Sequence, residues 1–110
     1  MLGVRCKKTN KNNMIVTNTI KVQRPELTQI IVTLCDEELI GKEFDEFYVS
    51  PKFYGGQKKT EKEILQDITN AGMINALGKE SIDFLIKNHL ITEESVVLIK
   101  KIPHAQVFML

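Results

Sequence analysis

The segment TQIIVTLC, residues 28–35, decides how the rest of the sequence is interpreted. In an extended chain, successive side chains point to opposite sides. One side of this segment then carries Ile30, Val32 and Leu34. The other side carries Ile31, Thr33 and Cys35. Both sides are mostly apolar, which is typical of a strand in the middle of a sheet. We therefore expect a central β-strand over residues 28–35.

Upstream of this strand, residues 14–22 (MIVTNTIKV) are rich in β-branched side chains. They place Met14, Val16, Ile20 and Val22 on alternate positions, which predicts a second strand. Pro25 lies between the two segments and has no amide hydrogen to give to a sheet. Residues 14–35 therefore predict a hairpin with a connection of about five or six residues.

Downstream of the central strand, residues 36–41 (DEELIG) predict a turn, which Gly41 closes because glycine tolerates a positive φ. Residues 46–50 (EFYVS) predict a short strand that Pro51 ends. Residues 52–59 (KFYGGQKK) predict a loop.

Two helices are predicted in the second half of the chain. Thr60 and Glu63 have the spacing of a capping box, so the first helix begins there. Its apolar positions are Ile64, Leu65, Ile68 and Ala71. Gly72 ends it, and residues 73–77 (MINAL) are interpreted as a short apolar link. Residues 79–90, after Gly78, predict the second helix.

The chain then predicts a polar turn at residues 92–95 and two strands, 96–99 and 102–110, joined by Lys100 and Lys101. The predicted order is β-β-β-α-α-β-β, with no βαβ unit. We therefore expect an α+β fold, with a small antiparallel or mixed β-sheet and a helical pair packed on one face. It forms one domain over residues 14–110, preceded by a basic polar arm at residues 1–13.

Composition and charge narrow the functional classes. The chain has 110 residues, of which 43% are hydrophobic and 26% charged, as in ordinary globular proteins. No apolar run approaches the roughly 18 residues that cross a membrane, so we expect a cytoplasmic protein. The net charge is +1, but residues 1–24 contain six basic residues and no acid, against 9 basic and 14 acidic residues in the remainder. Such a basic arm can steer a protein toward phosphates.

Three blocks of sequence stand out: VTLCDEELIGKEF at residues 32–44, FYGG at 53–56 and PHAQV at 103–107. Together they resemble the archaeal family called domain of unknown function 424, over roughly residues 14–110. This chain departs from the family pattern in its longer basic N-terminus and in the QKK at residues 57–59. The resemblance implies no assigned reaction. It implies a role near the ribosome, because the genes of the family tend to lie beside those of translation factors.

The KFYGGQKK segment has the composition of a contact for single-stranded RNA. It offers three cations, a stacking aromatic and two glycines that allow close approach: Lys52, Lys58, Lys59, Tyr54, Gly55 and Gly56. Phe53 is instead expected in the core, where a small domain needs large aromatics. The arm adds four further cations, Arg5, Lys7, Lys8 and Lys11.

His104 and Gln106 lie two positions apart on the last predicted strand and so share one of its faces. They form a compact patch of hydrogen-bond donors and acceptors. The patch either locks the turn at residues 36–41 or contacts the edge of a nucleotide. We expect no catalytic role for His104, because the sequence around it offers no phosphate or acyl-transfer motif.

Two alternatives compete with RNA binding. The first is a small hydrolase-like enzyme using Cys35 and His104, with Asp36 and Tyr54 nearby. A thiol next to carboxylates should have a raised pKa, which is wrong for a nucleophile, and no oxyanion hole is evident. The second is a protein-interaction adaptor that uses an exposed sheet edge.

Neither a metal nor a cofactor is expected. The Cys and His residues have no ligand spacing, and they number only four: Cys6, Cys35, His89 and His104. The two cysteines are most simply free thiols. We interpret the acids at residues 36–38 as part of a solvated turn, not as metal ligands. The chain also lacks the glycine-rich motifs that bind phosphate.

The sequence therefore predicts a non-enzymatic RNA-binding or ribosome-associated protein of the archaeal translation apparatus. Its expected partners are ribosomal RNA or another RNA, together with ribosomal proteins. We expect it to bind neither DNA nor a membrane, and the sequence makes no prediction of its oligomeric state.

Overall fold

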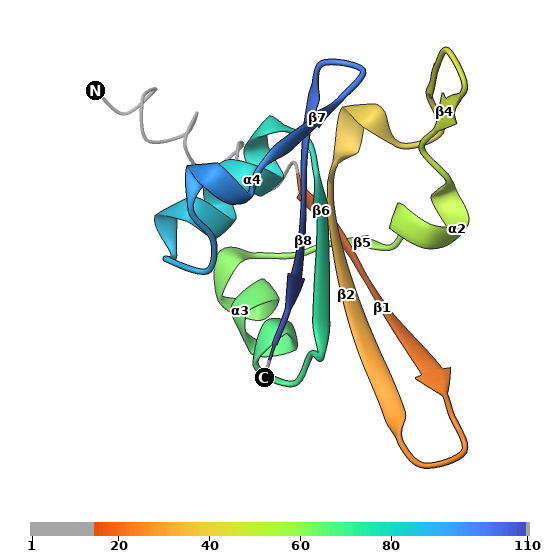
Figure 1. Ribbon diagram of the computed structural model, residues 1–110, viewed down its shortest axis with the longest axis vertical. Coiled ribbons are helices and arrows are strands. Elements are labelled where there is room, and N and C mark those ends of the chain that lie inside the picture. Colours follow the sequence, from red (N-terminus) through yellow and green to blue (C-terminus); the bar gives the residue numbers. More distant parts are fainter. Residues whose placement is uncertain (1–14, 110) are drawn as a thin grey trace.

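The computed structural model describes residues 15–109, which form one mixed sheet with helices on both faces (Figure 1). The six-stranded sheet has the order β5-β1-β2-β6-β8-β7. Its strands are β1 (Ile15–Gln23), β2 (Thr28–Asp36), β5 (Gln57–Lys58), β6 (Met73–Leu77), β7 (Val97–Ile99) and β8 (Ile102–Phe108). A separate two-stranded sheet pairs β3 (Glu43–Phe44) with β4 (Phe47–Tyr48).

The helices lie between these strands in the chain. They are α2 (Pro51–Tyr54), α3 (Glu61–Thr69) and α4 (Lys79–Lys87), with short 3-10 turns at Glu37–Leu39 and Glu93–Ser95. α3 and α4 pack on one face of the large sheet, whereas α2 and the β3–β4 hairpin lie on the other (Figure 1). The expected α+β class, with a mixed sheet and a helical pair on one face, is confirmed. None of the helices in residues 15–109 is long and apolar enough to span a bilayer.

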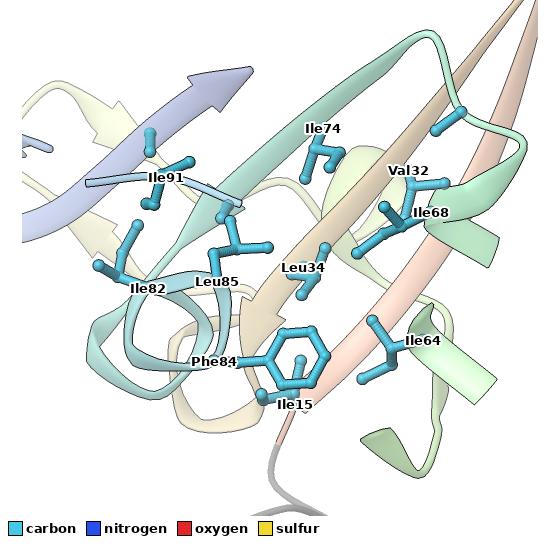
Figure 2. Packing of buried hydrophobic residues seen from close by; sticks show 13 residues of the cluster. Ile15, Val32, Leu34, Ile64, Ile68, Ile74, Ile82, Phe84, Leu85 and Ile91 are labelled. Carbon is cyan, nitrogen blue, oxygen red and sulfur yellow. The ribbon is translucent and has the colours of Figure 1, made fainter. Parts of the chain in front are cut away.

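The main core fills the space between the sheet and the helices α3 and α4 (Figure 2). The sheet contributes alternate residues such as Val32, Leu34 and Ile74, because every second side chain points to this face. The helices contribute Ile64, Ile68, Ile82, Phe84 and Leu85. Full burial of one such side chain stabilises the fold by roughly 1.5–3 kcal/mol, so this layer holds the sheet and the helical pair together.

The capping box of α3 is present as the sequence predicts. The Thr60 hydroxyl accepts the Glu63 amide at 3.2 Å, and the Glu63 carboxylate accepts the Thr60 amide at 3.0 Å. The predicted hairpin of residues 14–35 is also present over the described residues, as the antiparallel pair β1–β2. Its connection, residues 24–27, is shorter than expected because β1 extends to Gln23, one residue beyond the predicted strand.

The interpretation of residues 73–77 as a link is wrong. MINAL forms β6, which pairs in parallel with β2 and antiparallel with β8 at the centre of the sheet. The chain from β2 to β6 passes through α3, so the sheet does contain a βαβ crossover, contrary to the expectation. A five-residue apolar run has no periodicity of its own, and pairing on both sides makes it a strand.

Other elements differ from the predictions at their bounds. The segment KFYGGQKK is not a simple loop: it contains the end of α2 and the strand β5. The predicted strand at residues 46–50 shortens to Phe47–Tyr48, and the helices end at Thr69 and Lys87. Lys100 and Lys101 join β7 to β8 as predicted, both with positive φ.

Candidate functional site

The sheet face opposite α3 and α4, here called the open face, carries two of the residues singled out from the sequence, His104 and Gln106. Neighbouring residues in register on adjacent strands point to the same side. The register pairs Thr33 with Asn75 and Asn75 with Gln106, and it pairs Leu77 with His104. His104 and Gln106 therefore share the open face, as their spacing predicts.

The helix α2 covers one end of the open face. Its last residue but one, Phe53, offers a carbonyl that accepts hydrogen bonds from Asn18 Nδ2 at 3.1 Å and from Thr33 Oγ1 at 3.2 Å. A second, smaller core forms under this cover from Cys35, Val49, Tyr54, Leu77 and Ile102. Phe53 packs at the edge of that core and meets Tyr54 edge to face, with ring centroids 4.8 Å apart.

A polar cluster lies at the border between this core and the exposed part of the open face. The Tyr54 hydroxyl donates to Asn75 Oδ1 at 2.7 Å, and His104 Nε2 lies 3.2 Å from the same oxygen. Because Asn75 Oδ1 can only accept, the contact requires a hydrogen on His104 Nε2. Burial also lowers the pKa of His104, so the neutral Nε2–H tautomer is favoured, with Nδ1 as a hydrogen-bond acceptor.

The cluster presents polar groups that can recognise a ligand. The Asn75 amide nitrogen has no hydrogen-bond partner among the described residues, and the exposed Gln106 donates to Met73 Sδ at 3.1 Å. The open face thus presents amide and imidazole groups side by side. The expected locking of the turn at residues 36–41 by His104 and Gln106 is wrong, because the side-chain hydrogen bonds of both residues are with β6.

Cys35 and His104 do not form the pair that a hydrolase would need. Leu77 lies between them in register, so two strand spacings of about 4.8 Å separate their backbones. Cys35 is fully buried and donates to its neighbour's carbonyl, Asp36 O, at 3.4 Å. Burial, and to a smaller extent the Asp36 charge, raise the pKa of the Cys35 thiol to about 12. The thiol is therefore protonated and enclosed.

Asp36 belongs to the fold rather than to a reactive site. Its carboxylate accepts the Ser81 amide at 2.8 Å, the Ser81 hydroxyl at 2.9 Å and the Glu80 amide at 3.0 Å. It therefore caps the N-terminus of α4 from another element of the chain. Burial raises the pKa of Asp36, and these hydrogen bonds partly offset the rise. Within residues 15–109, no group of His, Cys, Asp and Glu side chains could hold a metal ion.

The FYGG segment has a structural role that the sequence interpretation missed. Tyr54 is 7% exposed, so its ring is not available to stack on a base. A Cβ on Gly55 would lie 2.3 Å from the Pro51 carbonyl oxygen, and one on Gly56 would lie 2.2 Å from that of Thr17. The glycines do permit close approach of a backbone, but that backbone is the protein's own.

The two lysines that follow the FYGG segment, Lys58 and Lys59, form ion pairs within the protein. Lys58 pairs with Glu37 at 3.4 Å and Lys59 with Asp67 at 2.7 Å. Lys52 is exposed and appears in none of the ion pairs of residues 15–109. The predicted arm residues Arg5, Lys7, Lys8 and Lys11 lie outside the described residues. Of the predicted contacts within the described chain, Lys52, Gly56, Lys58 and Gln106 are exposed, Gly55, Lys59 and His104 are half-buried, and Tyr54 is buried.

Sequence reasoning overlooked Asn75, the residue that joins Tyr54 to His104. It is the single polar residue of MINAL, flanked by buried Ile74 and Ala76. A strand interpretation of this run would have placed it on the face opposite those two side chains. That alternation was the available signal.

The comparisons agree with this architecture. A mixed sheet with helices on both faces defines an α+β protein, and a search of curated proteins gave no match. Residues 26–110 match the family described as "Protein of unknown function (DUF424)", and the chain belongs to that family. It is also similar in fold to a solved structure described as an uncharacterized conserved protein from Methanopyrus kandleri. The TM-score is 0.68 at 22% identity, covering 86% of this chain and 91% of that one.

Proposed function

We propose that this protein is a non-enzymatic RNA-binding protein that associates with the ribosome in the cytoplasm, with ribosomal RNA or another RNA as its partner. The observation that carries the proposal is the polar side of the open face, where Asn75, His104 and Gln106 line up beside an exposed aromatic, Phe108. Amides and imidazoles match the edges of unpaired bases, and an exposed ring on a sheet is a surface on which a base can stack.

The distribution of charge supports the same proposal. The segment 1–13 contains four basic residues and no acid. Residues 15–109 contain the other 11 basic residues and all 14 acids, a net charge of −3. A cationic segment on a mildly acidic body concentrates attraction for phosphates at one place, and the binding should weaken as salt rises.

The edge of the sheet favours a second candidate, a protein-interaction adaptor. β7 is the last strand of the sheet, and its side chains Val97 and Leu98 are 61% and 66% exposed. Another chain could add a strand there. Because β7 has only three residues, it offers little main-chain hydrogen bonding, so RNA binding remains the first candidate.

Fluorescence anisotropy with a labelled single-stranded RNA of about ten nucleotides tests the proposal. We expect binding whose affinity falls steeply with salt, and we expect the arm variant with Arg5, Lys7, Lys8 and Lys11 changed to Gln to lose most of it. The paired variant His104→Ala, Gln106→Ala should weaken binding further at fixed salt. Glu93→Gln, a charge change on the far side of the sheet, is the matched control. Absence of binding to the wild-type chain at low salt would contradict the proposal.

A further inference from the structure

A hollow opens at the end of the sheet where β6 is shorter than its neighbours. β6 begins at Met73, opposite Ile31 and Phe108, whereas β2 begins three residues before Ile31, at Thr28. The backbone turns away at Gly72, which donates to the Ile30 carbonyl at 2.8 Å. The space left between the ends of β2 and β8 has a volume of about 560 Å³.

Three segments distant in the sequence line this hollow. They are the β1–β2 turn, the connection from α3 to β6 and the end of β8. Backbone hydrogen bonds order these segments. Arg24 N donates to Leu27 O at 2.9 Å and closes the β1–β2 turn, and Met109 N donates to Gly72 O at 2.9 Å and joins the end of β8 to the connection from α3 to β6. The hollow is therefore part of the fold and not the product of one mobile loop.

The side chains in the hollow have complementary chemistry. Phe108 is 65% exposed and supplies a flat aromatic surface. Gln29 and Asn70 supply amide donors and acceptors, and Arg24 supplies a cation. Arg24 takes part in none of the ion pairs found across residues 15–109, so its guanidinium is available for an anion.

We propose that this hollow binds one unpaired nucleotide of an RNA strand, with the base stacked on Phe108 and a phosphate on Arg24. This inference rests on the proposed function and gives it a specific contact. A volume of this size lies within the usual range for small-ligand sites, roughly 300–1,000 Å³. Stacking needs an exposed ring, base recognition needs amides, and a phosphate needs a cation. Gln29 shares the open face with Phe108, and that face continues along β8 to Gln106 and His104, so a strand leaving the hollow meets the polar cluster.

The charge argument favours RNA over a peptide as the occupant. The one cation of the hollow is joined by no carboxylate among its lining residues. This charge favours an anionic occupant such as a nucleotide phosphate. The apolar lining residues include one aromatic ring, that of Phe108, as a stacking site requires; the others are Leu27, Ile30, Ala71 and Met109.

The test compares matched variants of the full chain in the same anisotropy assay. Phe108→Ala should weaken binding at least about tenfold, which corresponds to about 1.4 kcal/mol, whereas Phe108→Tyr should retain it. Leu98→Ala removes an equally exposed apolar side chain from β7 and should change nothing. Arg24→Gln should weaken binding and reduce the slope of log affinity against log salt by about 0.7, the value for one phosphate contact to a single strand. Arg24→Lys should preserve that slope.

Nuclear magnetic resonance provides a second readout that does not depend on affinity alone. Titration with the same RNA should shift the backbone amides of Asn70, Gly72 and Met109, and these shifts should vanish in Phe108→Ala. Circular dichroism would verify that the variants fold, which the exposure of Phe108 leads us to expect.

The outcomes separate this inference from the proposed function. If the wild type binds RNA and the Phe108 and Arg24 variants bind equally well, the hollow is not the nucleotide site, while RNA binding stands. If the wild type binds no RNA, both proposals fail. If the variants lose a copurifying protein and keep RNA affinity, the hollow has a protein occupant and the inference is overturned.

Discussion

Removal of the Asp36 carboxylate should destabilise the protein more than any other change of a single acid in the described chain. Asp36 is 5% exposed and receives three hydrogen bonds at the start of α4, two on Oδ1 from Ser81 and one on Oδ2 from Glu80. The helix therefore depends on a residue of β2 for its first-turn amides. Gly78 leaves room for this contact, because a Cβ there would lie 2.3 Å from Asp36 Cγ.

The magnitude follows from the bonds lost. A helix cap contributes about 0.5–2 kcal/mol, and a hydrogen bond to a charged group about 1.5–3 kcal/mol. The burial cost of the carboxylate offsets part of the sum, so we expect Asp36→Ala to lower the free energy of unfolding by about 3 kcal/mol. Asp36→Asn keeps an oxygen for Ser81 and directs an amide nitrogen toward the Glu80 amide. It loses one bond, and about 1–1.5 kcal/mol is expected.

Equilibrium urea unfolding followed by circular dichroism measures both values. Glu37→Ala is the matched control, because Glu37 is the next residue, is exposed and makes only a surface ion pair with Lys58. That control should change stability by less than about 1 kcal/mol. If Asp36→Ala were no more destabilising than the control, the cap would contribute nothing and the account of α4 would be wrong.

The pH dependence of the free energy of unfolding gives an independent test of the role of the Asp36 carboxylate. Burial raises the pKa of Asp36 in the folded protein above its ordinary value. The folded state therefore binds the proton more tightly than the unfolded state, and this group's contribution to stability is largest below the unfolded pKa. The contribution is lost as the pH rises through the folded pKa. The wild-type protein should accordingly gain stability relative to Asp36→Asn as the pH falls from above the folded pKa of Asp36 to below its unfolded pKa.

Three further changes have defined outcomes in urea unfolding. Thr60→Ala should cost about 1 kcal/mol through loss of the α3 cap, and an unchanged midpoint would mean that the cap is dispensable. Gly56→Ala should cost about 1–3 kcal/mol because its Cβ would overlap the β1 backbone, whereas Gly72→Ala meets only contacts of 3.7 Å and should be tolerated. The double change Lys100→Asn, Lys101→Gly should stabilise the β7–β8 turn by about 1–2 kcal/mol, because both positions have positive φ. A loss of stability would contradict the turn geometry.

Sequence reasoning succeeded where local chemistry determines local structure. The alternation in β2, the capping box at Thr60 and the proline near the β1–β2 turn are each readable within a few residues. The thiol of Cys35 was correctly expected to have a raised pKa from its acidic neighbour, although burial proved to be the larger cause.

Sequence reasoning failed where segments distant in the chain determine the local structure. Residues 73–77 become a strand because β2 and β8 pair with both edges, and neither partner is visible in a five-residue run. Because these residues were not interpreted as a strand, Asn75 and its contacts with Tyr54 and His104 were not predicted either. Gly56 was interpreted as space for a ligand because the β1 backbone that fills this space lies nearly 40 residues earlier, at Thr17.

Sucrose-gradient sedimentation of the native protein tests the central claim most directly. RNA association predicts that the full chain comigrates with ribosomal particles at low salt. Raised salt should release it, as should nuclease treatment. Sedimentation as a free small protein at low salt, or comigration that survives complete nuclease digestion, would contradict the account.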